Sequence, residues 1–255
     1  MLVGTANVAT LVRTLATATM DEFLTEPVRF EDVACFQMTM EMRNSAREAV
    51  LPPSLHPTIP AALSLQVWQV GDSPWDAFSM ALARVSCRSG VRARGFTTAV
   101  FVSSARACDA MRARFGFPAR VADVTLRRGY DGVDAAVRID GSPVFEVNAI
   151  DPEPMDVHDV QYTGTLNLAH TPNGLRLVQL EADHEATRVE RLTARLASFD
   201  GAAWGNPLLK PAAVVSSSLA LETVVFPAIR FVCKPDELAF TGTESVAARN
   251  PVAAG

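Results

Sequence analysis

Residues 115–122 read FGFPARVA, and this stretch, with the run before it, decides the fold that we expect. The preceding run from Ser104 to Arg114 is helix-like, and we expect one helix over Ala105 to Phe115. Upstream of it, residues 63–70 (LSLQVWQV) alternate apolar and polar side chains, as a strand covered on one face does. In that strand Gln66 and Trp68 share a face, which we expect to point into a pocket.

Further strands are predicted on both sides of the FGFPARVA stretch. Turn signals lie at residues 130–132, 140–141 and 171–174, the last reading Thr-Pro-Asn-Gly. Residues 183–196 carry charges almost throughout and fit either a long polar strand or a short surface helix. The other predicted strands cover residues 28–42, 78–87, 95–103, 122–128, 132–139, 142–150, 163–170 and 175–182.

Many strands joined by tight turns, with few helices, predict a mainly β (α+β) fold. We expect a closed or cone-like antiparallel β-barrel that encloses a cavity, with a few peripheral helices. The predicted divisions are an N-terminal arm (1–27), a single barrel domain (28–239) and a flexible tail (240–255).

Four stretches, read in order, resemble the acetoacetate decarboxylase family. They are AREAVLPPSL (46–55), the strand pair within 65–87, FGFPARVA (115–122) and VVSSSL (214–219), which runs into residues 224–231. Together they lie within roughly residues 28 to 234, in the order of the family. The resemblance implies the barrel described above and assembly into a homo-oligomer.

The resemblance departs from the family where its chemistry lies. In the family a lysine after the aromatic-proline pair attacks the substrate ketone, and a second lysine lowers the pKa of the first. The matching positions here are Ala119 and Arg120, and the chain has two lysines in all, Lys210 and Lys234. Alanine has no amine, and arginine stays protonated. The resemblance therefore implies that this chain does not decarboxylate through an imine.

Three more polar positions of the family match uncharged residues here. Its two glutamates correspond to Gln66 and Met80, and its arginine corresponds to Val33. These replacements make the predicted pocket more apolar and suit it to a larger hydrophobic substrate. We predict a small-molecule substrate bound by the following residues: Met80, Arg84, Trp68, Ala119, Phe117 and Val33.

Three residues are predicted to act in catalysis. Arg120 would hold a carboxylate or an enolate oxygen by charge-assisted hydrogen bonds, and Gln66 would donate to a substrate carbonyl. Glu146 would serve in acid–base chemistry. Each also has a structural alternative: an arginine that extends into solvent, a glutamine on a sheet face, and a surface glutamate.

Other polar residues are weaker candidates for the same pocket. His158 and Tyr162 lie in a loop where they could cover the mouth of the cavity, or simply be exposed. Glu222 stands among apolar neighbours, and we expect it to be buried.

Composition excludes several classes of function. A net charge of −5 and a pI near 5.4, with both signs interspersed, argue against binding to nucleic acid or to an anionic membrane. No stretch reaches the ~18 consecutive apolar residues of a membrane-spanning helix. Four cysteines without metal-ligand spacing predict buried free thiols, no metal and no cofactor, and we expect a cytoplasmic protein.

Two classes of function fit these residues. The first is an enzyme of secondary metabolism that isomerises, cyclises or dehydrates a keto or polyketide-like intermediate by shaping it and stabilising its enolate. The second is a protein that binds a small molecule without turning it over. A third hypothesis, decarboxylation by Lys210 or Lys234, requires one of these lysines to reach the cavity.

Overall fold

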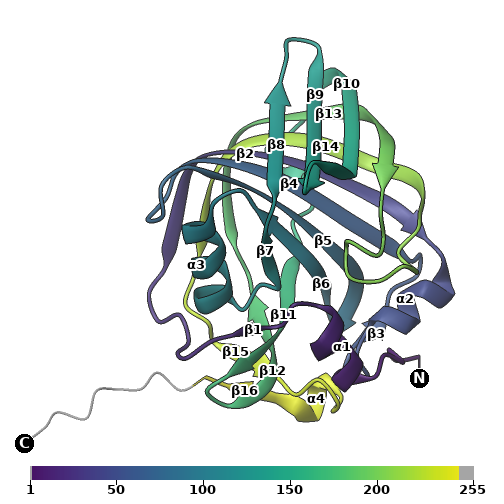
Figure 1. Cartoon of the computed structure of the whole chain (residues 1–255), viewed down its shortest axis with the longest axis vertical. Coiled ribbons are helices and arrows are strands. Elements are labelled where there is room, and N and C mark those ends of the chain that lie inside the picture. Colours follow the sequence, from purple (N-terminus) through teal and green to yellow (C-terminus); the bar gives the residue numbers. More distant parts are fainter. Residues whose placement is uncertain (1, 247–255) are drawn as a thin grey trace, which may run out of the picture.

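The computed structural model describes residues 2–246, which form one strongly curved sheet of 16 strands and four α-helices (Figure 1). The helices are α1 (Val8–Thr14), α2 (Asn44–Val50), α3 (Ala105–Phe115) and α4 (Ala239–Gly242), with a 3-10 turn at Val157–Asp159. The strands are β1 (Ala18–Thr19), β2 (Val28–Met42), β3 (His56–Pro57), β4 (Ala62–Asp72), β5 (Phe78–Ser89), β6 (Arg92–Val102), β7 (Ala119–Val121), β8 (Asp123–Arg128), β9 (Gly132–Ile139), β10 (Ser142–Pro154), β11 (Gly164–Thr171), β12 (Gly174–Leu180), β13 (Asp183–Phe199), β14 (Pro211–Phe226), β15 (Phe231–Cys233) and β16 (Thr243–Ser245).

The predicted strands and the predicted helix are confirmed within a few residues. The charged segment that fitted either a strand or a helix is a strand, β13, and it pairs with β10 on one side and β14 on the other. A long polar strand is stable there because both of its backbone edges are hydrogen-bonded to neighbouring strands.

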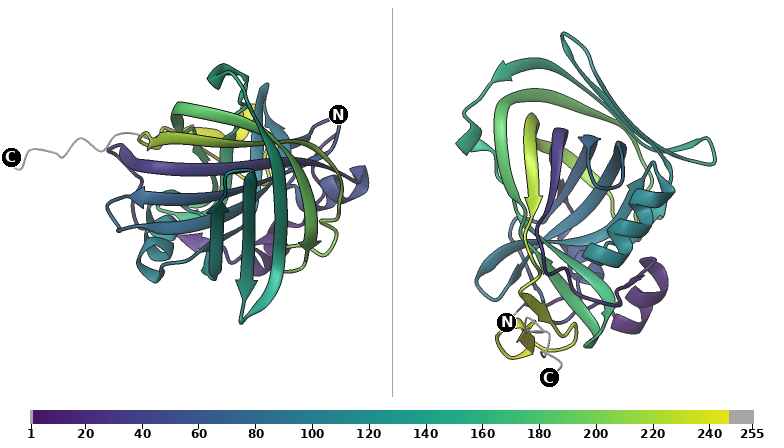
Figure 2. Two further views of the ribbon diagram at one scale, coloured as in Figure 1. Left: turned by 90° about the horizontal axis from the view of Figure 1, so that it is seen from above. Right: turned by 90° about the vertical axis from the view of Figure 1, so that its left-hand side faces the viewer.

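The mainly β prediction is confirmed. Of the predicted closed or cone-like antiparallel barrel, closure is not confirmed, and the pairing is not antiparallel throughout. The strand order runs β16-β15-β12-β11-β6-β5-β4-β2-β14-β13-β10-β9-β8, and no ladder joins β16 to β8 within residues 2–246. Three of the pairings, β1 with β11, β6 with β11 and β6 with β7, are parallel. The sheet curls into a cone-like half-barrel (Figure 2), the second of the two predicted shapes, and β8 lies close to β4, β5 and β6 without pairing with them.

Both faces of the central strands are buried. On β4, Leu63, Leu65 and Val67 belong to a core inside the curl, whereas Trp68 and Val70 belong to a second core on the other face. Helix α3 covers this second face with Ala107, Cys108, Met111 and Phe115. The alternation read from the sequence is therefore the alternation between two cores.

The two ends of the described chain pack on the sheet. Residues of the N-terminal arm contribute to both cores, among them Leu11 and Met20. The predicted tail is wrong for residues 240–246, because α4 and β16 lie there and β16 pairs with β15; residues 247–255 lie outside the described residues. No helix within residues 2–246 is both long and apolar enough to cross a membrane.

Candidate functional site

A cavity of about 260 Å³ opens on the face of the sheet that carries the second core. Its walls come from β4, β5, β6, β11, β13 and the end of β14, together with the loops before β7, β11 and β13. Five of the residues predicted to act on or bind the substrate line it: Gln66, Trp68, Met80, Arg84 and Phe117. Alternation along β4 and β5 places the first four there, since every second residue of a strand faces the same side, and Phe117 comes from the loop between α3 and β7.

Arg84 is the most unusual residue of the cavity wall, with only 4% of its surface exposed. Its Nη1 donates to the Thr163 carbonyl oxygen and to Thr165 Oγ1, both at 2.9 Å. Its Nε and Nη2 are buried and have no acceptor among the described residues. Burial lowers the pKa of Arg84 to about 10. Because this value is still well above 7, the guanidinium remains protonated at neutral pH. A buried cation with unused N–H groups beside a cavity is suited to bind an oxygen anion.

Two glycines make room for arginines in the wall. A Cβ at position 95 of β6 would lie 2.9 Å from Cβ of Arg84, and one at position 164 would lie 3.0 Å from Nη1 of Arg94. Any other residue at position 95 would displace the backbone or the stem of Arg84. The lack of a side chain at Gly95 therefore leaves the space that the Arg84 side chain occupies.

Gln66 of the cavity wall is connected through Gln37 to the loop before β11 by two hydrogen bonds. Gln66 Nε2 donates to Gln37 Oε1 at 2.5 Å, and Gln37 Nε2 donates to the Gln161 carbonyl oxygen at 3.2 Å. Gln37 and Gln66 face each other on β2 and β4. These two hydrogen bonds hold the loop that carries Tyr162 against the sheet. Trp68 Nε1, in contrast, is a buried donor with no partner among the described residues.

Tyr162, Glu222 and His184 form a polar cluster at the cavity wall. The Tyr162 hydroxyl donates to Glu222 Oε2 at 2.5 Å, and the carboxylate of Glu222 is completely buried. His184 Nδ1 lies 3.1 Å from Glu222 Oε1, without the alignment of a hydrogen bond. The Tyr162 and His184 rings stack with centroids 3.6 Å apart. Burial and the Glu222 charge raise the pKa of Tyr162, which keeps the phenol protonated as a donor.

The four cysteines are all buried and unpaired, as predicted. Cys35 lies near Glu222, and burial together with that negative charge raises the pKa of the Cys35 thiol well above its ordinary value. A thiol in this state is a poor nucleophile. The cluster therefore offers acid–base groups and not a cysteine nucleophile.

Arg120 does not lie at the cavity, contrary to the prediction. It is exposed on β7, where it donates to the Ala203 carbonyl oxygen and lies 5.0 Å from the centroid of the Phe101 ring. The reason is strand alternation. In the β6–β7 ladder Ala119 pairs with Val100 of the second core, so its neighbour Arg120 points to the opposite face, beside Phe101.

The structure also separates three other predicted site residues from the cavity. Glu146 is half-exposed on β10 and forms an ion pair with Arg138, away from the cavity lining. Ala119 and Val33 are buried in the second core beneath the cavity but are not among its lining residues.

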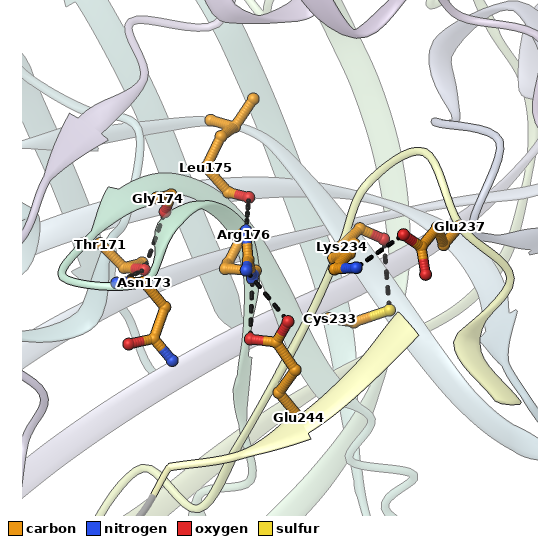
Figure 3. A network of polar contacts seen from close by, with 9 residues as sticks. All are labelled: Thr171, Asn173, Gly174, Leu175, Arg176, Cys233, Lys234, Glu237 and Glu244. Carbon is orange, nitrogen blue, oxygen red and sulfur yellow. Dashed lines mark hydrogen bonds and ion pairs between the residues drawn. The ribbon is translucent and has the colours of Figure 1, made fainter. Parts of the chain in front are cut away.

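Neither lysine of the chain is among the residues that line the cavity, and both belong to the described residues. Lys210 is exposed before β14, and it borders a shallow hollow made by residues 196–211. Lys234 follows β15 and donates to Glu237 at 2.7 Å, beside the pair formed by Arg176 and Glu244 (Figure 3).

Sequence reasoning missed several residues of the site, among them two with titratable side chains. His184 and Arg94 both line the cavity, but neither stands in a local motif. Glu222 is buried as expected, and of the two loop candidates Tyr162 reaches the cavity whereas His158 is exposed. His184 meets Glu222 because β13 pairs with β14, a long-range contact that spacing along the chain does not reveal.

The family of the chain follows from a comparison with protein-family models. The model described as acetoacetate decarboxylase matches residues 13–232. The chain belongs to the acetoacetate decarboxylase family. The match covers every residue that lines the cavity and the strands from β1 to β14, and it ends within β15. No curated protein sequence matches the chain.

Solved structures of the family share the fold of this member. An acetoacetate decarboxylase from Legionella pneumophila is 17% identical with a TM-score of 0.71, and the match covers 88% of each chain. The enduracididine biosynthesis enzyme MppR, in complex with pyruvate, is 20% identical with a TM-score of 0.66 over 79% of this chain and 88% of that one. An acetoacetate decarboxylase-like enzyme from Sphingomonas wittichii is 14% identical with a TM-score of 0.65, over 80% and 92% of the chains.

Proposed function

We propose that this family member is an enzyme that converts a keto acid or a polyketide-like carbonyl compound through its enolate, without forming an imine. The observation that carries the proposal is the buried guanidinium of Arg84 beside a cavity that neither lysine lines; its Nε and Nη2 have no partner within residues 2–246. Ala119 occupies the position that the resemblance aligns with the reactive lysine of the family, and it has no amine.

The oxygen atoms of the substrate would be held by unused donors. Nε and Nη2 of Arg84 and Nε1 of Trp68 are three buried donor nitrogens, on side chains that line the cavity, without acceptors among the described residues. A carboxylate or an enolate oxygen accepts hydrogen bonds from such groups, and the positive charge stabilises the anion more strongly in a dry cavity than in water. Arg84 therefore takes the role that the sequence assigned to Arg120.

The proton would be moved by the Tyr162, Glu222 and His184 cluster. The C–H bond next to the carbonyl breaks, its electron pair forms the enolate facing Arg84, and His184 takes the proton. The Glu222 carboxylate, 3.1 Å from Nδ1, stabilises the resulting imidazolium. Tyr162 fixes the position of Glu222 through its hydrogen bond.

Three outcomes of such an enolate fit the reactions predicted from the sequence. Return of the proton to a different carbon isomerises the substrate. Attack of the enolate carbon on a second carbonyl of the same molecule cyclises it. Loss of a β-hydroxyl group, protonated by His184 to leave as water, dehydrates it. None of these steps needs a cofactor.

Exchange of the C3 hydrogens of 2-oxobutanoate in D₂O, followed by NMR, tests the proposal. The wild type is expected to accelerate exchange, and Arg84→Met and His184→Ala to slow it by about 100-fold or more. Arg120→Met is the matched control, because it removes an arginine outside the cavity, and it should exchange at the wild-type rate. Binding without exchange would instead support a small-molecule binding protein.

A further inference from the structure

A second hollow adjoins the cavity and is larger, about 590 Å³. It is a groove, hereafter the distal groove, between the β5–β6 turn, the end of β12 and the segment from β14 to β16. Figure 1 places α4, β15 and β16, which supply part of its wall, at the lower end of the molecule. Three residues, Arg94, Glu181 and Asp183, line both the cavity and the distal groove. The two hollows are therefore adjacent, with these three residues at their boundary.

The distal groove carries large apolar side chains that remain open to solvent. Val91 is 81% exposed, Phe240 73% and Phe231 46%. The Phe240 ring lies over the turn at Gly90, where the nearest ring carbons would be 3.7 Å from an added Cβ. Three such side chains gathered in one groove form an apolar surface of the kind that marks a binding site.

The junction between the hollows is polar. Arg94 is buried and forms an ion pair with Glu181, and Arg92 contacts the same carboxylate at 3.2 Å. Asp183 stands next to His184 at the start of β13. A ligand that occupies both hollows would thus place polar atoms near Arg84 and apolar atoms past the Arg94–Glu181 pair.

We propose, building on the proposed function, that the substrate is a keto acid with an extended apolar chain. Its acidic head binds at Arg84 in the cavity, and its chain lies in the distal groove against Val91, Phe231 and Phe240. The cavity of about 260 Å³ offers Arg84 for the acidic head, and the adjoining groove of about 590 Å³ offers apolar side chains for the chain. The distal groove then selects for chain length, while the cavity carries the chemistry.

Calorimetric titration with 2-oxobutanoate and 2-oxodecanoate, at concentrations below micelle formation, tests this inference. Each methylene fully removed from water contributes about fourfold in affinity, so that six more carbons in a partly open groove are expected to give at least about tenfold. Phe240→Asp should abolish this gain and leave the affinity for 2-oxobutanoate unchanged. Tyr130→Asp is the matched control, because Tyr130 is a fully exposed aromatic residue outside the groove, and it should keep the gain.

The other outcomes distinguish failure of the distal-groove inference from failure of the proposed function. Equal affinity of the wild type for both acids, with 2-oxobutanoate binding still dependent on Arg84, would overturn the distal groove and leave the proposed function intact. No binding of either acid would overturn both. A wild-type oligomer that Phe240→Asp dissociates in analytical ultracentrifugation would show that a second copy covers the groove, and would also overturn the inference.

Discussion

Replacing Arg84 by methionine is expected to stabilise the protein and to abolish ligand binding at the same time. The fall in the pKa of Arg84 from its ordinary 12.5 to about 10 corresponds to about 3 kcal/mol of unfavourable burial of the charge. Methionine carries no charge, so it removes this unfavourable free energy of burial, and its side chain fills a similar volume. It loses the hydrogen bonds to Thr163 and Thr165, each worth about 1 kcal/mol net. The balance is a gain of about 1 kcal/mol, or about 2–4 °C in Tm for a chain of this size.

The assay pairs thermal unfolding with calorimetric titration of 2-oxobutanoate. Arg112→Met is the control, because Arg112 donates to three backbone carbonyls, those of Ala16, Thr17 and Ala119, and serves structure alone. Its loss should lower the Tm by at least about 5 °C, since three carbonyls lose their donor. If Arg84→Met lowers the Tm as much as this control and leaves the affinity unchanged, then Arg84 is structural and the reasoning is refuted.

Three further predictions test the packing around the site and the ends of the chain. Gly95→Ala should reduce the affinity for 2-oxobutanoate by about tenfold or more and destabilise the fold by about 1–3 kcal/mol. The reason is that the new Cβ would lie 2.9 Å from Cβ of Arg84. Unchanged affinity would contradict this prediction. Trp204→Ala should cost about 3–5 kcal/mol in chemical denaturation, because Trp204 is fully buried among three phenylalanine rings, and a loss under 1 kcal/mol would show that the site repacks. Glu244→Gln should lower the Tm at pH 7, because the hydrogen bond from Arg176 lowers the pKa of Glu244 and stabilises the ionised carboxylate in the folded protein. The Tm difference between wild type and variant should shrink as the pH falls below about 4.5, since this stabilisation is lost on protonation. A Tm difference independent of pH would argue against a stabilising Arg176–Glu244 ion pair.

Local patterns were sufficient for helix α3 and for most of the long strands, but not for β13, which fitted either a strand or a helix. Alternation in residues 63–70 predicted both the strand and the shared face of Gln66 and Trp68, because a strand of fixed period two determines which side chains lie together. The same period of two along β5 puts Arg84 and Met80, both predicted to bind the substrate, on one wall. These inferences needed no knowledge of which strands pair.

Predictions that depended on pairing could not be made from the chain alone. Arg120 was assigned to the cavity by its place after Phe117 and Pro118, but the parallel ladder of β7 with β6 turns it toward Phe101. The meeting of His184 with Glu222 depends on the β13–β14 register. Closure of the sheet likewise depends on how the long strands twist, which no local pattern records.

The most direct test of the account is borohydride trapping followed by intact-mass measurement. The protein is incubated with saturating acetoacetate or pyruvate, treated with borohydride, and compared with untreated protein. No change in mass is expected, because an imine needs an amine in the cavity and both lysines lie outside it. A stable adduct mapped to Lys210 or Lys234 would contradict the central claim and return the chain to imine chemistry.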